Sequence, residues 1–255
     1  MGFVPQKYRK SLAYSYTYGV FPTLELCSTR PDCVEQVFFS SPDKGGKGVA
    51  KILRFCRARR IPISKSATTV RRLSGRDFPV VGVLRKYSST IGRDVPHVVL
   101  HQPQYEGNVG TVIRTMLGFG FRHLALICPG PDLMSPEVIR ASMGAVFRLH
   151  WERFSNWDEY RQTFPERLLY CFMPDGDAFL EQVAPRGTFS PVFGSEGGGL
   201  PKAARRWGAT VRICHDRNID SLNLGVAIGI VLRHISRTTG DHMQNGVVFP
   251  ASGIT

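Results

Sequence analysis

The sequence predicts an α/β protein with two parts: a small N-terminal α/β domain and a larger C-terminal domain built on a parallel sheet. Two observations predict it. Short apolar runs alternate with segments whose apolar residues recur every three or four positions, as strands and helices of a layered α/β fold do. Residues 1–96 contain 18 Lys and Arg against 6 Asp and Glu, whereas residues 97–255 contain 15 against 14. The two parts therefore differ in charge as well as in position.

The N-terminal part alternates strands and helices. After a first helix, the sequence predicts a strand at 34–40, a helix with apolar residues at 49, 52, 53 and 56, a strand at 61–63, a helix at 68–73 ended by Gly75, and a strand at 80–87. The stretch 86–96 is rich in Ser, Thr, Gly and Pro, which is typical of a connection. We therefore expect a domain at 1–88 and a linker at 89–96.

The C-terminal part alternates more clearly. Predicted strands lie at 98–100, 123–128, 168–173, 191–193 and 210–213. Predicted helices are one with an apolar stripe at 109, 112, 113, 116 and 117, one beginning at Ser135-Pro136, and a last one at 222–237 with 227, 230, 231 and 234 on one face. We expect a second domain at 97–240 and a loose tail at 241–255.

Charge and composition restrict the function. A surplus of positive charge confined to one small domain favours binding of nucleic acid over simple solvation of helix faces. We expect the RNA contacts at Arg57, Arg59, Arg60, Lys65, Arg71 and Arg72. No apolar run reaches the ~18 residues of a membrane helix, and none of the six cysteines forms a Cys-x-x-Cys pair. These features predict a cytoplasmic protein without a membrane partner and without a metal site.

A glycine-rich loop follows the strand predicted at 191–193. Residues 194–199 read GSEGGG, and such a loop lets the backbone approach a flat ligand closely. The phosphate-binding alternative lacks the Gly-Lys-Ser/Thr that it requires, and the dinucleotide-binding alternative belongs to the first strand-to-helix turn. Two further polar groups precede helices. Ser221 stands just before the last predicted helix, and Asn223 lies near its first turn. Capping explains Asp220 or Ser221, but it does not explain Asn223, which has a mediocre helix propensity. Asn108 reads by itself as a cap, and Arg114 reads as a surface residue at the border of its helix.

The three segments together resemble the signature motifs of the SpoU/TrmH family of RNA ribose 2′-O-methyltransferases, which belong to the SPOUT class. They are 107–115 (GNVGTVIRT), 192–200 (VFGSEGGGL) and 220–227 (DSLNLGVA). The family's Asn and Arg, six positions apart, match Asn108 and Arg114. Its Gly and Glu match Gly194 and Glu196, and its Ser-x-Asn matches Ser221 and Asn223. The catalytic resemblance covers about 97–237, and 1–88 resembles more weakly the family's substrate-binding domain.

The resemblance implies fold, cofactor and partners. It implies a C-terminal trefoil knot, a homodimer formed through the catalytic domain, and S-adenosylmethionine bound in the knot loops. The cofactor contacts that it implies are Gly194, Glu196, Ile213, Leu222 and Asn223, and the catalytic set is Asn108, Arg114, Glu196, Ser221 and Asn223. The chain departs from the family at Cys214 and His215, where relatives often have Pro and Met.

The resulting hypothesis is transfer of a methyl group from S-adenosylmethionine to a ribose 2′-hydroxyl of ribosomal or transfer RNA. An arginine side chain stays protonated in proteins and is a poor base. We therefore expect Arg114 to hold an RNA phosphate and polarise the hydroxyl, although the family is often described with this Arg as the base. The alternatives are a non-catalytic RNA-binding or assembly protein on the same fold and a nucleotide-handling α/β enzyme that uses the glycine loop.

Overall fold

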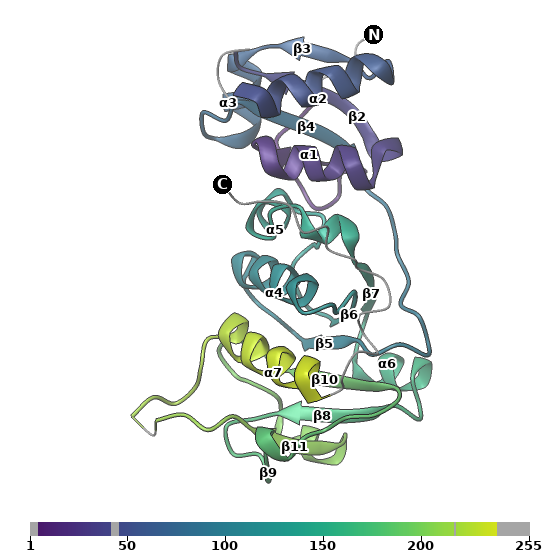
Figure 1. Cartoon of the computed structure of the whole chain (residues 1–255), viewed down its shortest axis with the longest axis vertical. Helices are drawn as coiled ribbons and strands as arrows, with labels where there is room; N and C mark the ends of the chain where they lie inside the picture. The colour runs from purple at the N-terminus through teal and green to yellow at the C-terminus, as the bar shows by residue number, and fades with distance from the viewer. Residues whose placement is uncertain (1–4, 42–45, 217, 239–255) are drawn as a thin grey trace.

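The computed structural model of the 255-residue chain describes residues 5–41, 46–216 and 218–238. The predicted tail at 241–255 lies outside these residues. Figure 1 shows two layered α/β parts, one above the other along the long axis of the molecule. In the part of the chain that the structure describes, no helix is both long and apolar enough to cross a membrane.

The N-terminal part is a four-stranded sheet in the order β1-β4-β2-β3. Its strands are β1 (Tyr14–Tyr18), β2 (Val34–Phe39), β3 (Ile63–Lys65) and β4 (Val80–Arg85), and its helices are α1 (Val20–Thr29), α2 (Gly46–Ala58) and α3 (Ala67–Ser74). A 3-10 helix, Pro31–Cys33, follows α1. Strand β3 begins two residues later than predicted, because Ile61 and Pro62 close the turn after α2.

The helices of this part cover opposite faces of the sheet. Apolar residues of α1 and α2 share a core with Val37 and Leu84, whereas Val70 and Leu73 of α3 pack with Tyr16 on the other face. Helix α3 has the ends that the sequence predicts. The Ser66 side chain caps its first turn by accepting from the Thr69 N–H, and Gly75 ends it with a left-handed φ of 71°.

The C-terminal part is a seven-stranded sheet in the order β7-β6-β5-β10-β8-β11-β9, and every pair of neighbouring strands is parallel. Its strands are β5 (Val98–His101), β6 (His123–Ile127), β7 (His150–Phe154), β8 (Leu168–Phe172), β9 (Ala178–Phe179), β10 (Phe189–Phe193) and β11 (Ala209–Arg212). Its helices are α4 (Glu106–Gly118), α5 (Pro136–Ala141), α6 (Trp157–Thr163) and α7 (Leu224–Thr238), with 3-10 helices at Ala145–Arg148, Leu180–Gln182 and Lys202–Arg206. The predicted α/β fold with a parallel sheet is confirmed.

Both faces of this sheet are buried. Val98 and Leu100 of β5 face the core that contains α4, α5 and α7, whereas Val99 between them faces the core under α6. This alternation explains why the strands read as continuous apolar runs, as strands covered by helices on both sides do.

Strand β1 and α1 bring the two parts together. Strand β1 contacts α5, and α1 contacts the 3-10 helix Ala145–Arg148. The Arg30 Nε donates to the Phe147 carbonyl at 3.1 Å, and Glu25 forms an ion pair with Arg148. Lys86 lies 2.7 Å from Asp132, with both side chains less than a fifth exposed. The N-terminal part is therefore packed against the C-terminal part rather than tethered beside it.

Three strands escape prediction from sequence, namely β1, β7 and the two-residue β9. Strands β1 (YSYTY) and β7 (HWERF) are the edge strands of their sheets, and both carry polar residues. Ser15 and Thr17 of β1 are fully buried, and the Ser15 hydroxyl donates to the Met134 carbonyl of the other part. A polar strand buried by another domain carries no apolar pattern of its own.

Helix α7 begins later and is rotated relative to the prediction. It starts at Leu224, not at 222, and its buried residues are Leu224, Gly225, Ile228, Val231, Leu232 and Ile235. The predicted stripe is wrong at Ile230, which is 40% exposed, because packing on α4 selects the face that contains Leu224 and Ile228.

Candidate active site

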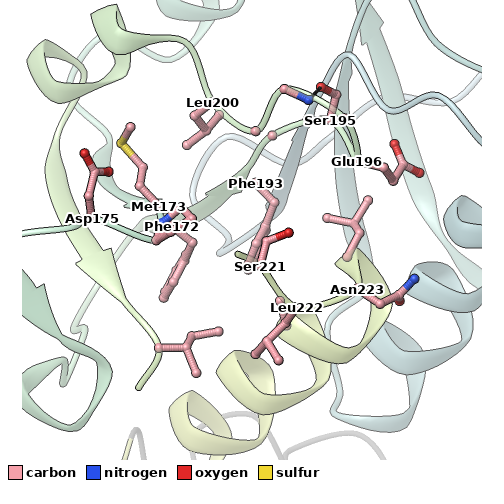
Figure 2. A pocket seen from close by; sticks show the side chains of 18 of the residues that line it. Phe172, Met173, Asp175, Phe193, Ser195, Glu196, Leu200, Ser221, Leu222 and Asn223 are labelled. Atoms are coloured by element: carbon pink, nitrogen blue, oxygen red, sulfur yellow. Dashed lines mark hydrogen bonds between the residues drawn. The ribbon is translucent and has the colours of Figure 1, made fainter. Parts of the chain in front are cut away.

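A cavity of about 690 Å³ opens where β8, β10 and β11 end and α7 begins (Figure 2). The carboxyl ends of parallel strands lie at one edge of a sheet, where α/β proteins bind their ligands. The residues that line it come from the segments after the three strands, from the start of α4 and from the segment before α7.

The glycine loop forms one wall because two of its positions admit only glycine. A Cβ atom on Gly194 would lie 1.9 Å from the Gly199 carbonyl carbon, and Gly199 has a left-handed φ of 63°. The Ser195 and Gly199 backbones exchange two hydrogen bonds across this turn, at 3.2 and 2.9 Å. The loop therefore folds back on itself and presents Glu196 at its tip.

Glu196 joins the glycine loop to the start of α4. One of its carboxylate oxygens accepts from the Gln104 N–H at 2.8 Å, and the other accepts from the Asn108 side-chain amide at 3.0 Å and from the Tyr105 N–H at 3.4 Å. Asn108 is thus not the cap that its sequence context indicates. Helix α4 already begins at Glu106, and Asn108 turns its side chain toward Glu196.

These hydrogen bonds keep Glu196 ionised. Partial burial raises the pKa of its carboxyl, but donation from the Gln104 N–H and the Asn108 amide outweighs it, and the pKa ends below its ordinary value. At neutral pH the group is therefore a carboxylate whose two oxygens are both engaged. It is well suited to hold the start of α4 in a fixed position relative to the glycine loop.

Asn223 is the cap of α7. Its side-chain oxygen accepts from the Gly225 N–H at 2.9 Å and from the Val226 N–H at 3.4 Å. The expectation that Asp220 or Ser221 caps this helix, with Asn223 left over, is therefore wrong. Because the oxygen faces the helix, the amide NH₂ of Asn223 is the group left to bind a ligand.

The floor of the cavity is apolar. Phe172 and Phe193 stack with ring centroids 4.9 Å apart, and Met173, Leu200, Ile213 and Leu222 complete this surface. Polar groups stand around it, namely the Asp175 carboxylate, the Ser221 hydroxyl and the glycine-loop amides (Figure 2). A site with a flat apolar floor and a polar rim suits a nucleoside-like ligand. No group of three or more potential metal ligands gathers among the residues that the structure describes.

Comparison with known proteins identifies the family. The model of the SpoU rRNA methylase family matches residues 96–233, which is more than half of the chain. The chain belongs to the SpoU rRNA methylase family. Relatives of this SpoU chain include an uncharacterised tRNA/rRNA methyltransferase of Synechocystis sp., 27% identical over 143 residues, which cover 55% of this chain and 52% of that protein. One from Mycobacterium sp. (strain KMS) is 34% identical over 137 residues, 51% of this chain and 42% of that protein. The chain thus spans about half the length of these curated relatives.

Solved structures agree with this fold. An AdoMet-bound rRNA methyltransferase from Sinorhizobium meliloti superposes with a TM-score of 0.75 at 22% identity, over 88% of this chain and 87% of that one. A protein studied for 2-OH methylation of C/U34 on tRNA is 30% identical, with a TM-score of 0.54, over 58% of this chain and 97% of that one.

The structure brings most of the predicted site of this SpoU chain together. Gly194, Ile213 and Leu222, predicted for the cofactor, all line the cavity. So do Asn108, Glu196, Ser221 and Asn223.

Arg114 is the exception. It is exposed on α4, does not line the cavity, and makes no hydrogen bond or ion pair with any residue that the structure describes. It lies six residues after Asn108, which places it about 240° further round the helix.

The predicted RNA contacts fall on two faces. Arg57, Arg59 and Arg60 belong to α2 or its end, whereas Arg71 and Arg72 belong to α3 on the opposite side of the sheet. Lys65 ends β3 between them. All six side chains are exposed, with Arg59 near Asp32 (3.7 Å) and Arg71 paired with Asp77 (2.8 Å). The single basic cluster of the sequence is thus divided in space.

Sequence reasoning missed several lining residues. Tyr105 lines the cavity and is 61% exposed. Gln104 does not line it but holds Glu196 through its backbone N–H. His215, noted only as a departure from the family, also lines the cavity, and its Nδ1 lies 2.8 Å from the Ile213 carbonyl. A backbone donor and an exposed aromatic leave no signal in a single sequence.

Proposed function

We propose that this chain transfers a methyl group from S-adenosylmethionine to a ribose 2′-hydroxyl of RNA. The observation that carries the proposal is Glu196, tied to Asn108 and two backbone amides at the edge of a cavity with an apolar floor. Family membership and the resemblance of all three motifs support the same reaction.

The cavity fits the cofactor. Gly194 lets the glycine loop fold tightly on itself at the cavity wall, because a Cβ there would collide with the Gly199 backbone. The stacked Phe172 and Phe193 give the cavity floor a flat apolar surface. Gly194, Ile213 and Leu222 would hold the cofactor by backbone and apolar contact. Bound there, S-adenosylmethionine supplies an electrophilic methyl group on a sulfonium. A structurally similar methyltransferase from Sinorhizobium meliloti was solved with AdoMet bound.

The polar residues orient the acceptor. Asn108 and Glu196 hold α4 against the glycine loop, and Ser221 and Asn223 line the cavity just before α7. Glu196 is a positioning residue, since both of its oxygens are occupied and its low pKa makes it a weak base. Holding the hydroxyl in line with the methyl group contributes several kcal/mol, up to ~7–11 in the best cases.

We further propose that the protein acts as a homodimer in which Arg114 enters the partner's cavity. The exposed residues of α4 include Thr111 and Arg114, and those of α7 include Val226 and Ile230, which are 52% and 40% exposed. Thr111 lies against Gly225, so the two exposed faces adjoin. The exposed apolar patch of Val226 and Ile230 suits contact with a second copy of this chain. That contact would bring the exposed guanidinium of Arg114 to the cavity of the second copy. There Arg114 would hold a phosphate and polarise the hydroxyl.

The proposal also covers RNA binding, the path of the chain in the C-terminal part and the cellular location. The basic residues Arg57, Arg59, Arg60, Lys65, Arg71 and Arg72 would bind the RNA backbone. In this proposal residues 1–88 bind RNA, residues 89–96 connect the two domains, and residues 97–240 transfer the methyl group. The trefoil knot that the resemblance implies in the C-terminal part belongs to the same proposal. We expect the reaction in the cytoplasm.

Two measurements test the function. Calorimetric titration should show binding of S-adenosylmethionine and none of ATP; binding of ATP alone would indicate a nucleotide-handling enzyme. Incubation with methyl-labelled S-adenosylmethionine and separate tRNA and rRNA pools should give label in alkali-resistant dinucleotides, which only a 2′-O-methyl group produces. RNA binding without any label would favour the non-catalytic alternative.

A further inference from the structure

The first described residues form a strap, 5–13, that crosses from the N-terminal part to the C-terminal part. At its start, Arg72 of α3 donates to the Pro5 carbonyl at 3.0 Å. Further along, the Tyr8 hydroxyl donates to Asp132 at 2.6 Å, and Lys86 donates to the Lys10 carbonyl at 2.9 Å. The strap contains no helix or strand, yet contacts at both ends hold it in place.

A second cavity, of about 560 Å³, lies along the strap. Tyr8 and Lys10 form one side, and the segment 129–132 and the turn 102–106 before α4 form the other. Ser195 of the glycine loop also lines it. Because Ser195 lines the candidate active site as well, the second cavity is a groove that leads from the strap to that site.

The strap is basic. Lys7, Arg9 and Lys10 are exposed, and none forms an ion pair with a residue that the structure describes. The acidic groups of the groove are Asp132 and Glu106. Donation from Lys86 and Tyr8 overcomes burial and lowers the pKa of Asp132, so its charge is already compensated. Glu106 remains as the one other carboxylate of the groove. Lys10 lines the groove, and Lys7 and Arg9 are exposed beside it in the strap.

The side of the groove opposite the strap carries two glutamine side chains, whose amides can hydrogen-bond to nucleobases. Gln102 and Gln104 are exposed and line the groove, and amide side chains both donate to and accept from base edges. Gln102 has a φ of +52°, an unfavourable value for a residue with a side chain. This conformation turns the chain at the end of β5 and leads it to Gln104, whose N–H binds Glu196.

We propose that the strap and its groove hold the RNA strand adjoining the nucleotide in the active site, with Lys7, Arg9 and Lys10 on its phosphates. The proposal rests on the function proposed above and adds a contact surface outside the six basic residues predicted from sequence. It also favours the α3 face of the N-terminal sheet as the RNA path, since Arg72 binds the strap and α2 lies on the opposite face. Exposed cations next to the exposed side-chain amide of Gln104 suit a strand with free bases.

The test uses the full chain with Lys7→Ala and Lys10→Ala combined. Arg186→Ala with Arg206→Ala is the matched control, since it removes two equally exposed charges outside both cavities. Affinity for a fluorescein-labelled oligouridylate and for unfractionated tRNA is measured against salt. We expect the strap variant to lose about tenfold in affinity and about one unit of salt slope per lysine. The control should change far less, and S-adenosylmethionine affinity should stay the same in both.

Crosslinking locates the contact independently. RNA containing 4-thiouridine should crosslink to peptides from residues 5–13. A strap variant that binds RNA like the control, with crosslinks on α2 instead, would overturn the strap proposal while leaving methyl transfer intact. A wild-type chain that binds S-adenosylmethionine but no RNA would instead overturn the proposed function.

Discussion

At the scale of single residues, Glu196 connects two segments that lie 88 positions apart in the chain. The Asn108 amide and two backbone N–H groups converge on one carboxylate, and this convergence fixes where α4 begins relative to the glycine loop. A charged acceptor serves better here than a neutral one, because hydrogen bonds to ionised groups are the stronger kind.

Glu196→Gln should therefore destabilise the protein in a pH-dependent way. The folded-state pKa of Glu196 is lowered, so its contribution is fully present above the unfolded pKa of about 4.3 and is lost as pH falls through the folded pKa. We expect a loss of about 1 kcal/mol at pH 7 that shrinks below pH 4, measured by urea unfolding. Glu166→Gln, at an exposed carboxylate, is the control. A pH-independent loss would contradict the proposed cause.

Arg114→Ala should abolish methyl transfer without changing S-adenosylmethionine affinity or thermal stability, because the side chain is exposed and outside the cavity. Mixing distinguishes where Arg114 acts. If it acts in the partner's site, subunits with Arg114→Ala and subunits with Glu196→Ala should together recover about a quarter of wild-type activity, since half of the dimers regain one intact site. No recovery on mixing would place Arg114 in the site of its own chain.

At the scale of elements, α7 both borders the cavity and packs on α4. Its first residue follows the Asn223 cap at the cavity, and its buried face packs on α4. The opposite face exposes Val226 and Ile230. Gly229 does not belong to that outer face, because a Cβ there would contact Thr115 of α4 at 3.6 Å. A bulky group at Gly229 would therefore disturb the monomer as well as a dimer.

Substitutions at Asn223 should separate capping from ligand binding. Asn223→Ala should cost about 1 kcal/mol of stability through loss of the cap. Asn223→Asp keeps an accepting oxygen for the Gly225 N–H and should restore stability. If the Asn223 NH₂ serves the reaction, the Asp variant stays inactive in the methyl-transfer assay although its unfolding matches the wild type. Full activity of the Asn223→Asp variant would show that Asn223 only caps α7 and does not serve the reaction.

Ile230→Glu should convert the proposed dimer to a monomer, because it places a charge in the apolar patch without entering the α4 contact. Light scattering at micromolar concentration measures the mass, and unfolding should remain cooperative. Thr188→Glu, at an exposed position before β10, is the control. An Ile230→Glu protein with unchanged mass would exclude this face as the interface.

At the scale of the whole molecule, the two parts share a partly buried ionic contact. Lys86 follows β4, Asp132 follows β6, and Tyr8 of the strap completes the group. One core cluster includes residues of both parts, among them Leu26 and Phe147. The strap groove exists only while this contact holds the parts in place.

Asp132→Asn should weaken this contact. It removes the charge that accepts from Lys86 and Tyr8, and we expect a loss of about 1.5–3 kcal/mol in urea unfolding. Glu35→Gln is the control, because the Arg85–Glu35 pair is 3.8 Å long and largely exposed, and such pairs contribute about 0–1 kcal/mol. Equal losses in the two variants would contradict a special role for the contact between the parts.

The sequence alone determined the class of fold, the glycine loop and part of the cavity lining, including Asn108, Glu196 and Asn223. These signals are local. Apolar periodicity indicates strands and helices, and the loop at 194–199 and the Ser-Leu-Asn segment are recognised from their own residues without knowledge of the fold. Strands β1 and β7 and the exposed Tyr105 lay beyond it, since polar edge strands and surface aromatics leave no periodic pattern.

Only the tertiary structure decided which residues meet. It bound Asn108 to Glu196, made Asn223 a cap, turned Ile230 outward and Arg114 away from the cavity, and divided the basic residues between two faces of one sheet. The physical reason is that direction and partner depend on how helices pack, and a helix rotated by one residue, or 100°, exposes a different face while its sequence stays the same.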